Sequence, residues 1–332
     1  MALDTLVIFG IILCVTQPVT IIANLLTIIA FFKISNLQMH KSNLLIFVLS
    51  MVDFTSGVYQ LLYVGIPFTF SLGPPLGEIG CKMTALLEYT YYAGNYLLVA
   101  ISIDRVLLVS MDYSRYLKMM TSTHLKVTTG ICFLICYMAA ILEMSLWNYA
   151  KRNNANAANI SFKEACYYPT RQLKWFNIYL SVCFYYIPLF LVGILSIIFV
   201  KRLLIRLNKN RRIGPAHQNS DNNSNENPNE ISGPCENQAH QYDTAKKRYI
   251  KPAITLAALV LAMCVSMVPY CTYLVVAALS TNFSSTVVYI MYLNQQLSPF
   301  LDPLFFAATQ KDIREFYGNK IRAVFRTFCN PN

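Results

Sequence analysis

Seven long apolar runs, separated by shorter polar segments, recur along nearly the whole chain. Each reaches or exceeds the roughly 20 residues that a helix needs to cross the hydrocarbon core of a bilayer. The pattern predicts an all-α membrane protein in which residues 1–332 form one domain, a seven-transmembrane helix bundle. The predicted spans cover residues 5–32, 42–68, 82–110, 124–148, 175–205, 250–279 and 286–308. The first run is too long for the core of a cleavable signal peptide and lacks a basic start.

Two segments outside these spans have distinct patterns. Residues 208–245 are rich in Asn, Ser and Glu with almost no apolar side chains, which predicts a disordered inner loop. Basic clusters flank this loop, and they suit anionic membrane lipid or a protein partner. Over residues 310–326, apolar positions recur among basic ones, which predicts a short amphipathic helix on the inner membrane surface. These apolar positions are Ile313, Phe316, Ile321, Val324 and Phe325.

Composition and charge distribution support a membrane location and set the orientation. The chain is 55% hydrophobic and only 13% charged, whereas a soluble domain averages about 25% charged residues, so lipid must cover part of the surface. A net charge of +11 would suit nucleic acid. With the N-terminus outside, however, 21 of the 27 Lys and Arg residues fall on the inner side, a strong positive-inside bias. We therefore expect a multi-pass plasma-membrane protein with an extracellular N-terminus, a cytoplasmic C-terminus and no nucleic-acid partner.

Several residues outside the spans are candidates for covalent modification. Cys81 and Cys166 lie on the predicted outer side, where an oxidising compartment would pair them, and two free thiols are the alternative. Asn159 in Asn-Ile-Ser is an outer N-glycosylation acceptor. Cys329 is a candidate for palmitoylation or a lone exposed cysteine. The four His build no catalytic or metal site with the acids, so we expect no enzyme activity and no cofactor.

Short motifs occur in a characteristic order on the predicted spans. They are Ala23-Asn24, Leu49-x-x-x-Asp53, Asp104-Arg105, Pro188, Pro269 and Asp302-Pro303-x-x-Phe306. Together with Cys81 and Cys166, this series resembles the rhodopsin-like (class A) G-protein-coupled receptors across nearly the entire chain. The resemblance implies a receptor that transduces signals at the cell membrane, a disulfide between the two outer cysteines and a heterotrimeric G protein as partner.

Within that family, the chain looks most similar to the amine receptors, the muscarinic and histamine types in particular. Glu88-Tyr89 follows Cys81 by seven residues, and Tyr113-x-x-Tyr116-Leu117 follows the third span. This resemblance implies a small-molecule ligand of the biogenic-amine kind.

The chain also departs from the family pattern. Met267 stands where most members have a Trp in the sixth span, and the fourth span lacks its usual Trp. Ser196 and Phe306 stand where tyrosines usually support the active state. These departures imply a switch that is altered, basally active or damaged.

Glu88 is the principal candidate for ligand binding. A carboxylate deep in an outer-facing cavity would pair with an ammonium ion, and desolvation strengthens the pair. Counted from Cys81, Glu88 is in register with the acid of amine receptors; counted back from Arg105, it is one position off, about 100° around the helix. The alternative is a carboxyl that is protonated or hydrogen-bonded to a tyrosine. The other candidates, which include rings that could box a cation or belong to an interfacial belt, are Tyr89, Tyr92, Met267, Tyr270, Tyr273, Tyr292 and Gln296.

Asp53 and Asp302 are a second candidate site. The family resemblance implies that they pack together in mid-membrane, often around a sodium ion. Two buried carboxylates cannot both ionise cheaply, so either one takes a proton or a cation bridges them. Asn24, Asn95 and Ser298 are candidates to complete this ion or polar network, whereas Gly94 supplies no hydroxyl.

Asp104 and Arg105 are the third candidate site, because an ionised pair at the edge of hydrocarbon needs a role or a partner. The resemblance implies a G-protein switch in which Arg105 pairs with Asp104 at rest and meets the G protein after the sixth span swings outward. Asp302, Pro303 and Phe306 are assigned to the same switch. The usual acid at the inner end of the sixth span is replaced by Tyr249, so we expect a weaker latch and elevated ligand-free signalling.

The favoured function is therefore a receptor that binds a small cationic ligand and activates a heterotrimeric G protein. The first alternatives are a neutral, lipid or peptide ligand, or a constitutively active receptor without one. A channel or transporter would favour inverted repeats or a charged path through the spans, which we do not see. A light receptor needs a Schiff-base lysine in the seventh span, and residues 286–308 contain none.

Overall fold

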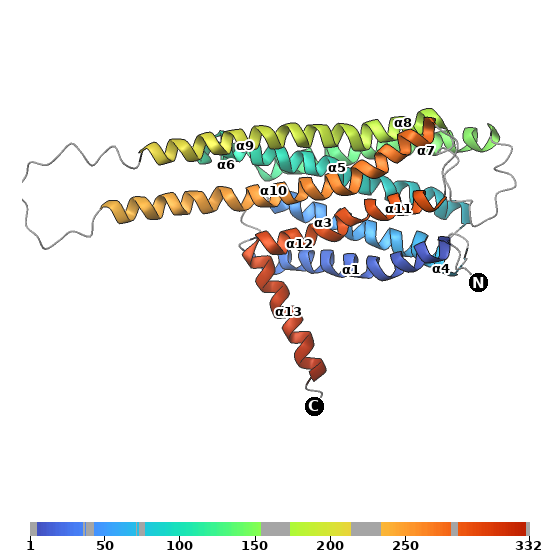
Figure 1. Cartoon of the computed structure of the whole chain (residues 1–332), viewed down its shortest axis with the longest axis horizontal. Coiled ribbons are helices and arrows are strands. Elements are labelled where there is room, and N and C mark those ends of the chain that lie inside the picture. The colour runs from blue at the N-terminus through green and yellow to red at the C-terminus, as the bar shows by residue number, and fades with distance from the viewer. Residues whose placement is uncertain are drawn as a thin grey trace, which may run out of the picture.

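The computed structural model of the chain describes residues 5–35, 37, 43–70, 72, 77–153, 173–213, 234–279 and 285–329. Within these ranges the structure contains helices and no strand, and the helices lie side by side in one bundle (Figure 1). This confirms the all-α seven-helix prediction. The spans are α1 (Thr5–Lys33), α3–η1–α4 (Asn43–Gln60, Leu61–Gly65, Ile66–Phe70), α5 (Gly77–Ser110), α7 (Ser122–Asn153), α8–η4–α9 (Lys174–Leu180, Ser181–Tyr186, Ile187–Ile213), α10 (Pro234–Leu279) and α11–α12 (Ser285–Gln295, Leu297–Thr309).

The seventh span differs from the others in having a residue, Gln296, that belongs to neither of its two helices. Six described helical segments are individually long and apolar enough to cross a membrane. The seventh consists of α11 and α12, which meet at Gln296. Two short helices accompany the spans, α6 (Tyr113–Met119) after the third and α13 (Lys311–Cys329) after the seventh. Because α1 and α13 begin at opposite ends of the bundle, the chain crosses it an odd number of times (Figure 1).

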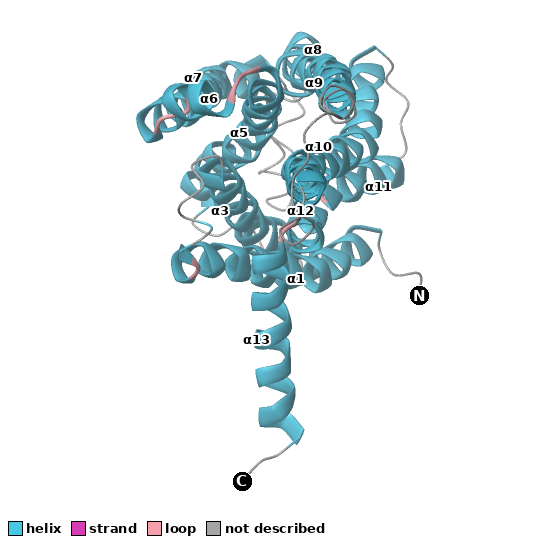
Figure 2. Cartoon of the chain, turned by 90° about the vertical axis from the view of Figure 1, so that its left-hand side faces the viewer, coloured by secondary structure: helices cyan, strands magenta, loops and turns pink. Residues whose placement is uncertain are grey.

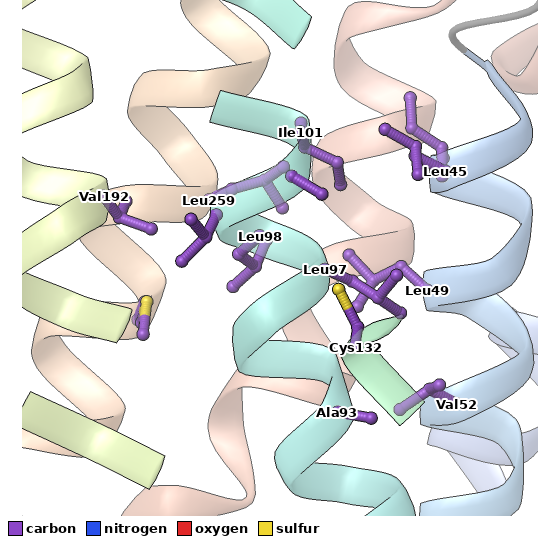
Figure 3. Close-up of a cluster of buried hydrophobic side chains, with 14 of the residues drawn as sticks. Leu45, Leu49, Val52, Ala93, Leu97, Leu98, Ile101, Cys132, Val192 and Leu259 are labelled. Atoms are coloured by element: carbon purple, nitrogen blue, oxygen red, sulfur yellow. The ribbon is translucent and has the colours of Figure 1, made fainter. Parts of the chain in front are cut away.

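Helix α5 occupies the middle of the bundle. It contacts α3, α7, α9 and α10, and the view along the bundle shows these helices around it (Figure 2). Leu49 and Val52 of α3 lie against Ala93 and Leu97 of α5 in the buried apolar layer (Figure 3). The central helix therefore carries residues of both the outer and the inner candidate sites.

Two spans contain a π-helical turn in their outer halves. Leu61–Gly65 precedes Pro67, and Ser181–Tyr186 precedes Pro188. A π-turn redirects the side chains beyond it and is frequent at functional sites. Both turns lie on the half of the bundle that contains the predicted ligand site.

Two helices reach into the segment predicted to be a disordered inner loop, residues 208–245. Helix α9 continues to Ile213, and α10 already begins at Pro234, so both helices project past the rest of the bundle (Figure 1). Once a helix is nucleated within a membrane span, each added residue brings one more backbone hydrogen bond, so extension is favourable. Residues 214–233 lie outside the described residues.

Helix α13 runs across the bundle axis from the end of α12 (Figures 1 and 2). Ile313 is fully buried, and the Tyr317 hydroxyl donates to Ala23 O at 2.6 Å and lies 2.6 Å from Thr27 Oγ1. Burial raises the pKa of Tyr317 above its ordinary value, so the hydroxyl keeps its proton for this bond. These contacts fix α13 to the inner half of α1.

A close approach between α1 and α4 depends on Gly10. A Cβ atom at this position would lie 2.6 Å from Thr69 N, 2.7 Å from Thr69 Oγ1 and 3.0 Å from Gly65 O. Backbone atoms cannot rotate away, so Gly10→Ala is expected to destabilise the bundle by about 1–3 kcal/mol. Thermal unfolding in detergent and the amount of protein at the cell surface measure this effect.

Gly193 offers the matched control. A Cβ built there meets nothing within 4 Å, and Ala is favoured over Gly inside a helix by about 0.5–1 kcal/mol. Gly193→Ala should therefore leave the unfolding temperature unchanged or raise it. Equal losses in the two variants would contradict the close-approach argument.

Candidate functional site

The outer half of the bundle contains a continuous cluster of aromatic rings contributed by several spans. Tyr92 of α5 is fully buried and stacks on Phe184, with ring centroids 5.3 Å apart. Its ring also lies 5.4 Å from that of Tyr185, which lies 5.7 Å from Tyr270. Tyr270 in turn lies 6.0 Å from Tyr292. The third, fifth, sixth and seventh spans thus meet through this outer aromatic cluster.

Glu88 is part of this outer aromatic cluster. It is half-buried, and its carboxyl accepts a hydrogen bond from the Tyr92 hydroxyl one turn further along α5. It also interacts electrostatically with Tyr185 of η4 and Tyr292 of α11. The carboxyl therefore lies among tyrosine hydroxyls, in the arrangement that the sequence offered as the alternative to ligand pairing.

Tyr91 is the α5 residue that reaches the sixth and seventh spans. Its hydroxyl lies 3.4 Å from Met267 Sδ and donates to Gln295 O at 3.3 Å. Sequence reasoning named Tyr89 and Tyr92 and missed Tyr91, although it follows Glu88 by three residues and so lies one helical turn away.

Two glutamines hold tyrosine hydroxyls at the edges of the cluster. Gln60 Oε1 accepts from the Tyr292 hydroxyl at 2.8 Å, and Gln295 Nε2 donates to the Tyr185 hydroxyl at 2.8 Å. Gln296, the amide that the sequence favoured, is also buried and lies at the break between α11 and α12. Sequence reasoning missed Gln60 and Tyr185, whose partners are far away in the chain.

The remaining candidates for ligand binding lie in or beside the same cluster. Tyr89 is fully buried, with its ring 5.5 Å from that of Phe184. Tyr273 is half-buried, and its ring lies 6.4 Å from that of Tyr270. The structure thus brings the predicted residues together in one cluster. Those that belong to α5 point in different directions from this helix.

Asp53 and Asp302 meet in the interior, as the second hypothesis requires. Both are buried, and their carboxyl groups lie close enough to interact with each other. Two adjacent buried carboxyl groups cannot both ionise cheaply, so a proton shared between them, or a cation bridging them, remains the prediction for this site. Within the described part of the chain, no group of three or more Cys, His, Asp or Glu side chains is arranged to hold a metal ion.

The predicted polar neighbours of this acid pair are only partly directed at it. Asn24 Nδ2 donates to Pro299 O at 3.1 Å, on the same span as Asp302, and Ser298 is buried nearby in the chain. Asn95 Nδ2 instead donates to Phe184 O of η4 at 2.9 Å. Its amide nitrogen thus faces the fifth span, away from the role that the sequence suggested.

The inner ends of the spans hold Arg105 in a closed arrangement. Arg105 Nε lies 3.7 Å from Asp104 Oδ2, and the side chain of Arg105 is only 10% exposed. Asp104 is fully buried, and its Oδ1 accepts a hydrogen bond from the Tyr116 hydroxyl of α6 at 2.7 Å. Phe306 is also fully buried.

Residues 23–306, most of the chain, match the family described as "7 transmembrane receptor (rhodopsin family)". The chain belongs to the rhodopsin family of seven-transmembrane receptors. This family consists of receptors and not of enzymes, and membership confirms the predicted receptor class and a multi-pass membrane protein. Comparison with curated individual proteins found no match.

The receptor has an inner contact that sequence reasoning did not anticipate. Arg206 of α9 donates to the carbonyl oxygens of Leu108 at 3.4 Å, Val109 at 3.0 Å and Met111 at 2.8 Å. The last carbonyls of a helix have no partner within it, and a cationic side chain satisfies them well. Arg206 thus ties the fifth span to the inner end of the third, a few residues beyond Arg105.

The receptor also contains a buried acid that sequence reasoning overlooked. Glu143 of α7 is fully buried, on the helix face shared with the buried residues Cys136, Ala139 and Ala140. An ionisable residue inside a membrane span is costly and is commonly functional. The signal was available, because Glu143 is an acid within the long apolar run of the fourth span.

Four predicted modification sites of the receptor stay predictions. Cys166 and Asn159 lie outside the described residues, as do the side chains of Cys81 and Cys329. The side chain of Tyr249 is outside them as well.

Proposed function

We propose that the receptor binds a small cationic, amine-like ligand at the outer aromatic cluster and activates a heterotrimeric G protein. The observation that carries the proposal is a carboxyl, Glu88, half-buried among tyrosines of its own span, the fifth and the seventh. A carboxylate and aromatic ring faces together are the groups that recognise an ammonium ion. Desolvation within the bundle strengthens their attraction.

The coupling part of the proposal rests on the inner site. Arg105 lies at the end of α5, where a paired arginine can be exposed by an outward movement of α10. We further propose an extracellular N-terminus and a cytoplasmic C-terminus, supported by the bias of Lys and Arg. Tyr249 stands where the family usually has an acid, and this replacement supports elevated ligand-free signalling. The contact of Arg206 with the inner end of the third span opposes it, because it holds the resting arrangement.

A second candidate ligand is a neutral molecule with hydrogen-bonding groups. The observation that favours it is Tyr91, whose uncharged hydroxyl reaches both the sixth and the seventh span. The hydroxyl of Tyr91 and the amides of Gln60 and Gln295 would then orient the ligand. A specific ligand pocket commonly combines an apolar wall with a few polar groups of this kind.

An amine panel in cells separates these candidates. In G-protein activation assays, Glu88→Gln is expected to reduce sensitivity to the responding amine about 100-fold, because one partner of a desolvated charge pair is removed. The substitution retains an oxygen that accepts the Tyr92 hydrogen bond. Ligand-free activation is measured in the same cells.

Glu315→Gln is the matched control, since the exposed side chain of Glu315 pairs with Lys311 of α13 at 3.5 Å. It should leave amine sensitivity unchanged. An amine response that survives Glu88→Gln undiminished would favour the neutral ligand. A chain that activates no G protein with any amine or without ligand would count against the coupling itself.

A further inference from the structure

Prolines in the spans leave backbone carbonyls that side chains of other spans satisfy. A proline has no N–H for the carbonyl four residues earlier, and in a bilayer no water replaces it. Among the described residues, four such carbonyls accept a hydrogen bond from a side chain of another span. Asn95 donates to Phe184 O, freed by Pro188, and Asn294 donates to Val265 O, freed by Pro269. Tyr91 donates to Gln295 O, freed by Pro299, and Asn24 donates to Pro299 O, freed by Pro303. Three of the four donors are asparagine amides.

Asn294 joins the seventh span to the sixth at the sixth span's proline. Its Nδ2 donates to Val265 O at 2.8 Å and to Ser266 O at 3.1 Å. Both carbonyls lie immediately on the inner side of Pro269, the position at which α10 can bend. An outward swing of the inner half of α10 about Pro269 must stretch or break these two bonds.

Asn95 joins the third span to the fifth in the same way. Its Nδ2 donates to Phe184 O at 2.9 Å, and the neighbouring Tyr96 hydroxyl donates to Cys183 O at 2.7 Å. These two carbonyls belong to the π-turn before Pro188. Asn95 is buried, so an unsatisfied carbonyl there would face apolar side chains.

We propose that Asn95 and Asn294 are positioning residues whose amides hold the proline hinges of the fifth and sixth spans in the resting arrangement. The resting arrangement is the one described above, with Arg105 paired and covered. The two amides thereby set how often the receptor signals without ligand. This inference rests on the proposed coupling to a G protein.

The decisive test is a double-mutant cycle between each amide and its proline. Asn294→Leu removes the donors at nearly constant size, and ligand-free G-protein activation per surface receptor is expected to rise about fivefold, the shift that about 1 kcal/mol produces. Pro269→Ala restores an N–H that can satisfy Val265 O from within α10. In that background, Asn294→Leu should change activation less than twofold. The same cycle is run with Asn95→Leu and Pro188→Ala.

A second readout does not need a G protein. Hydrogen exchange of the peptide covering residues 253–266, measured on purified full-length receptor in lipid nanodiscs, should speed up in Asn294→Leu and recover when Pro269→Ala is added. Asn43→Leu is the matched control, because Asn43 Nδ2 donates to Leu37 O at 3.2 Å, a carbonyl that no proline frees.

The outcomes distinguish the proposed clamp, meaning the hold of Asn95 and Asn294 on the proline hinges, from the proposed coupling to a G protein. Faster exchange that Pro269→Ala cancels, without G-protein activation in any variant, supports the clamp and assigns the failure to the proposed function. Activation and exchange that both respond as expected support both. An effect of Asn294→Leu that is equal in the two backgrounds, or no effect on exchange at all, overturns the inference.

Discussion

Arg105→Ala is expected to abolish G-protein activation, with a loss of at least about tenfold, while the amount of receptor at the cell surface stays within twofold of the parent. Arg105 is covered at the inner end of α5 and pairs with Asp104 at 3.7 Å. Its removal deletes the cation proposed to meet the partner. Asp104 keeps the hydrogen bond from Tyr116, so the folded bundle retains a donor for the buried carboxyl. Cell-surface labelling and a G-protein dissociation assay measure the two quantities together.

Asp104→Asn provides the opposing control. The amide oxygen still accepts the Tyr116 hydrogen bond, but the charge that holds Arg105 is gone. Ligand-free activation should therefore rise, because the resting arrangement loses an ion pair that the active arrangement does not use. Unchanged activation in Arg105→Ala would remove this residue from the proposed switch, whatever the control does.

The spans were predictable from the sequence because length and hydrophobicity are local properties of a segment. A run of about 20 apolar residues has few alternatives to a membrane helix. The same local reasoning does not give the ends of the helices beside the inner loop, where α9 extends to Ile213 and α10 begins at Pro234. Composition describes how polar a segment is, and it does not describe how far a helix propagates from an adjacent span.

The sequence left two alignments of the third span open, and they differ in the direction in which the candidate ligand-binding residues of α5 point. Cys81 and Arg105 lie towards opposite ends of α5, and each can serve as the reference for aligning this helix with the family. The two alignments differ by one residue at Glu88. One residue corresponds to about 100° of rotation, so only contacts with other spans decide. The contacts of Tyr91 with Met267 and Gln295 are of this kind, and no local pattern in the sequence marks them.

Contacts that use backbone carbonyls were beyond sequence reasoning. Arg206 contacts three carbonyls of α5 and its following turn, and Asn294 contacts two of α10. Every residue has a carbonyl, so no side-chain pattern marks these acceptors. A proline four residues later is the one sequence mark of a freed carbonyl, and it does not reveal which distant side chain supplies the donor.

The acid pair should show strongly non-additive effects on stability. Asp53 and Asp302 are buried close to each other. Asp53→Leu or Asp302→Leu alone leaves one carboxyl in the interior without its partner, which is expected to cost about 3 kcal/mol. Asp53→Leu combined with Asp302→Leu removes both polar groups, and apolar replacements of similar volume often restore stability.

Thermal unfolding of the four receptors in detergent tests this cycle. The double variant is expected to unfold at a higher temperature than either single variant, although each substitution alone is destabilising. Asp112→Leu is the control, because Asp112 precedes α6 without capping it through its side chain, and it should change stability by less than about 0.5 kcal/mol. Additive losses from the two single substitutions would show that Asp53 and Asp302 act separately, since a shared proton couples the two carboxyl groups into one unit.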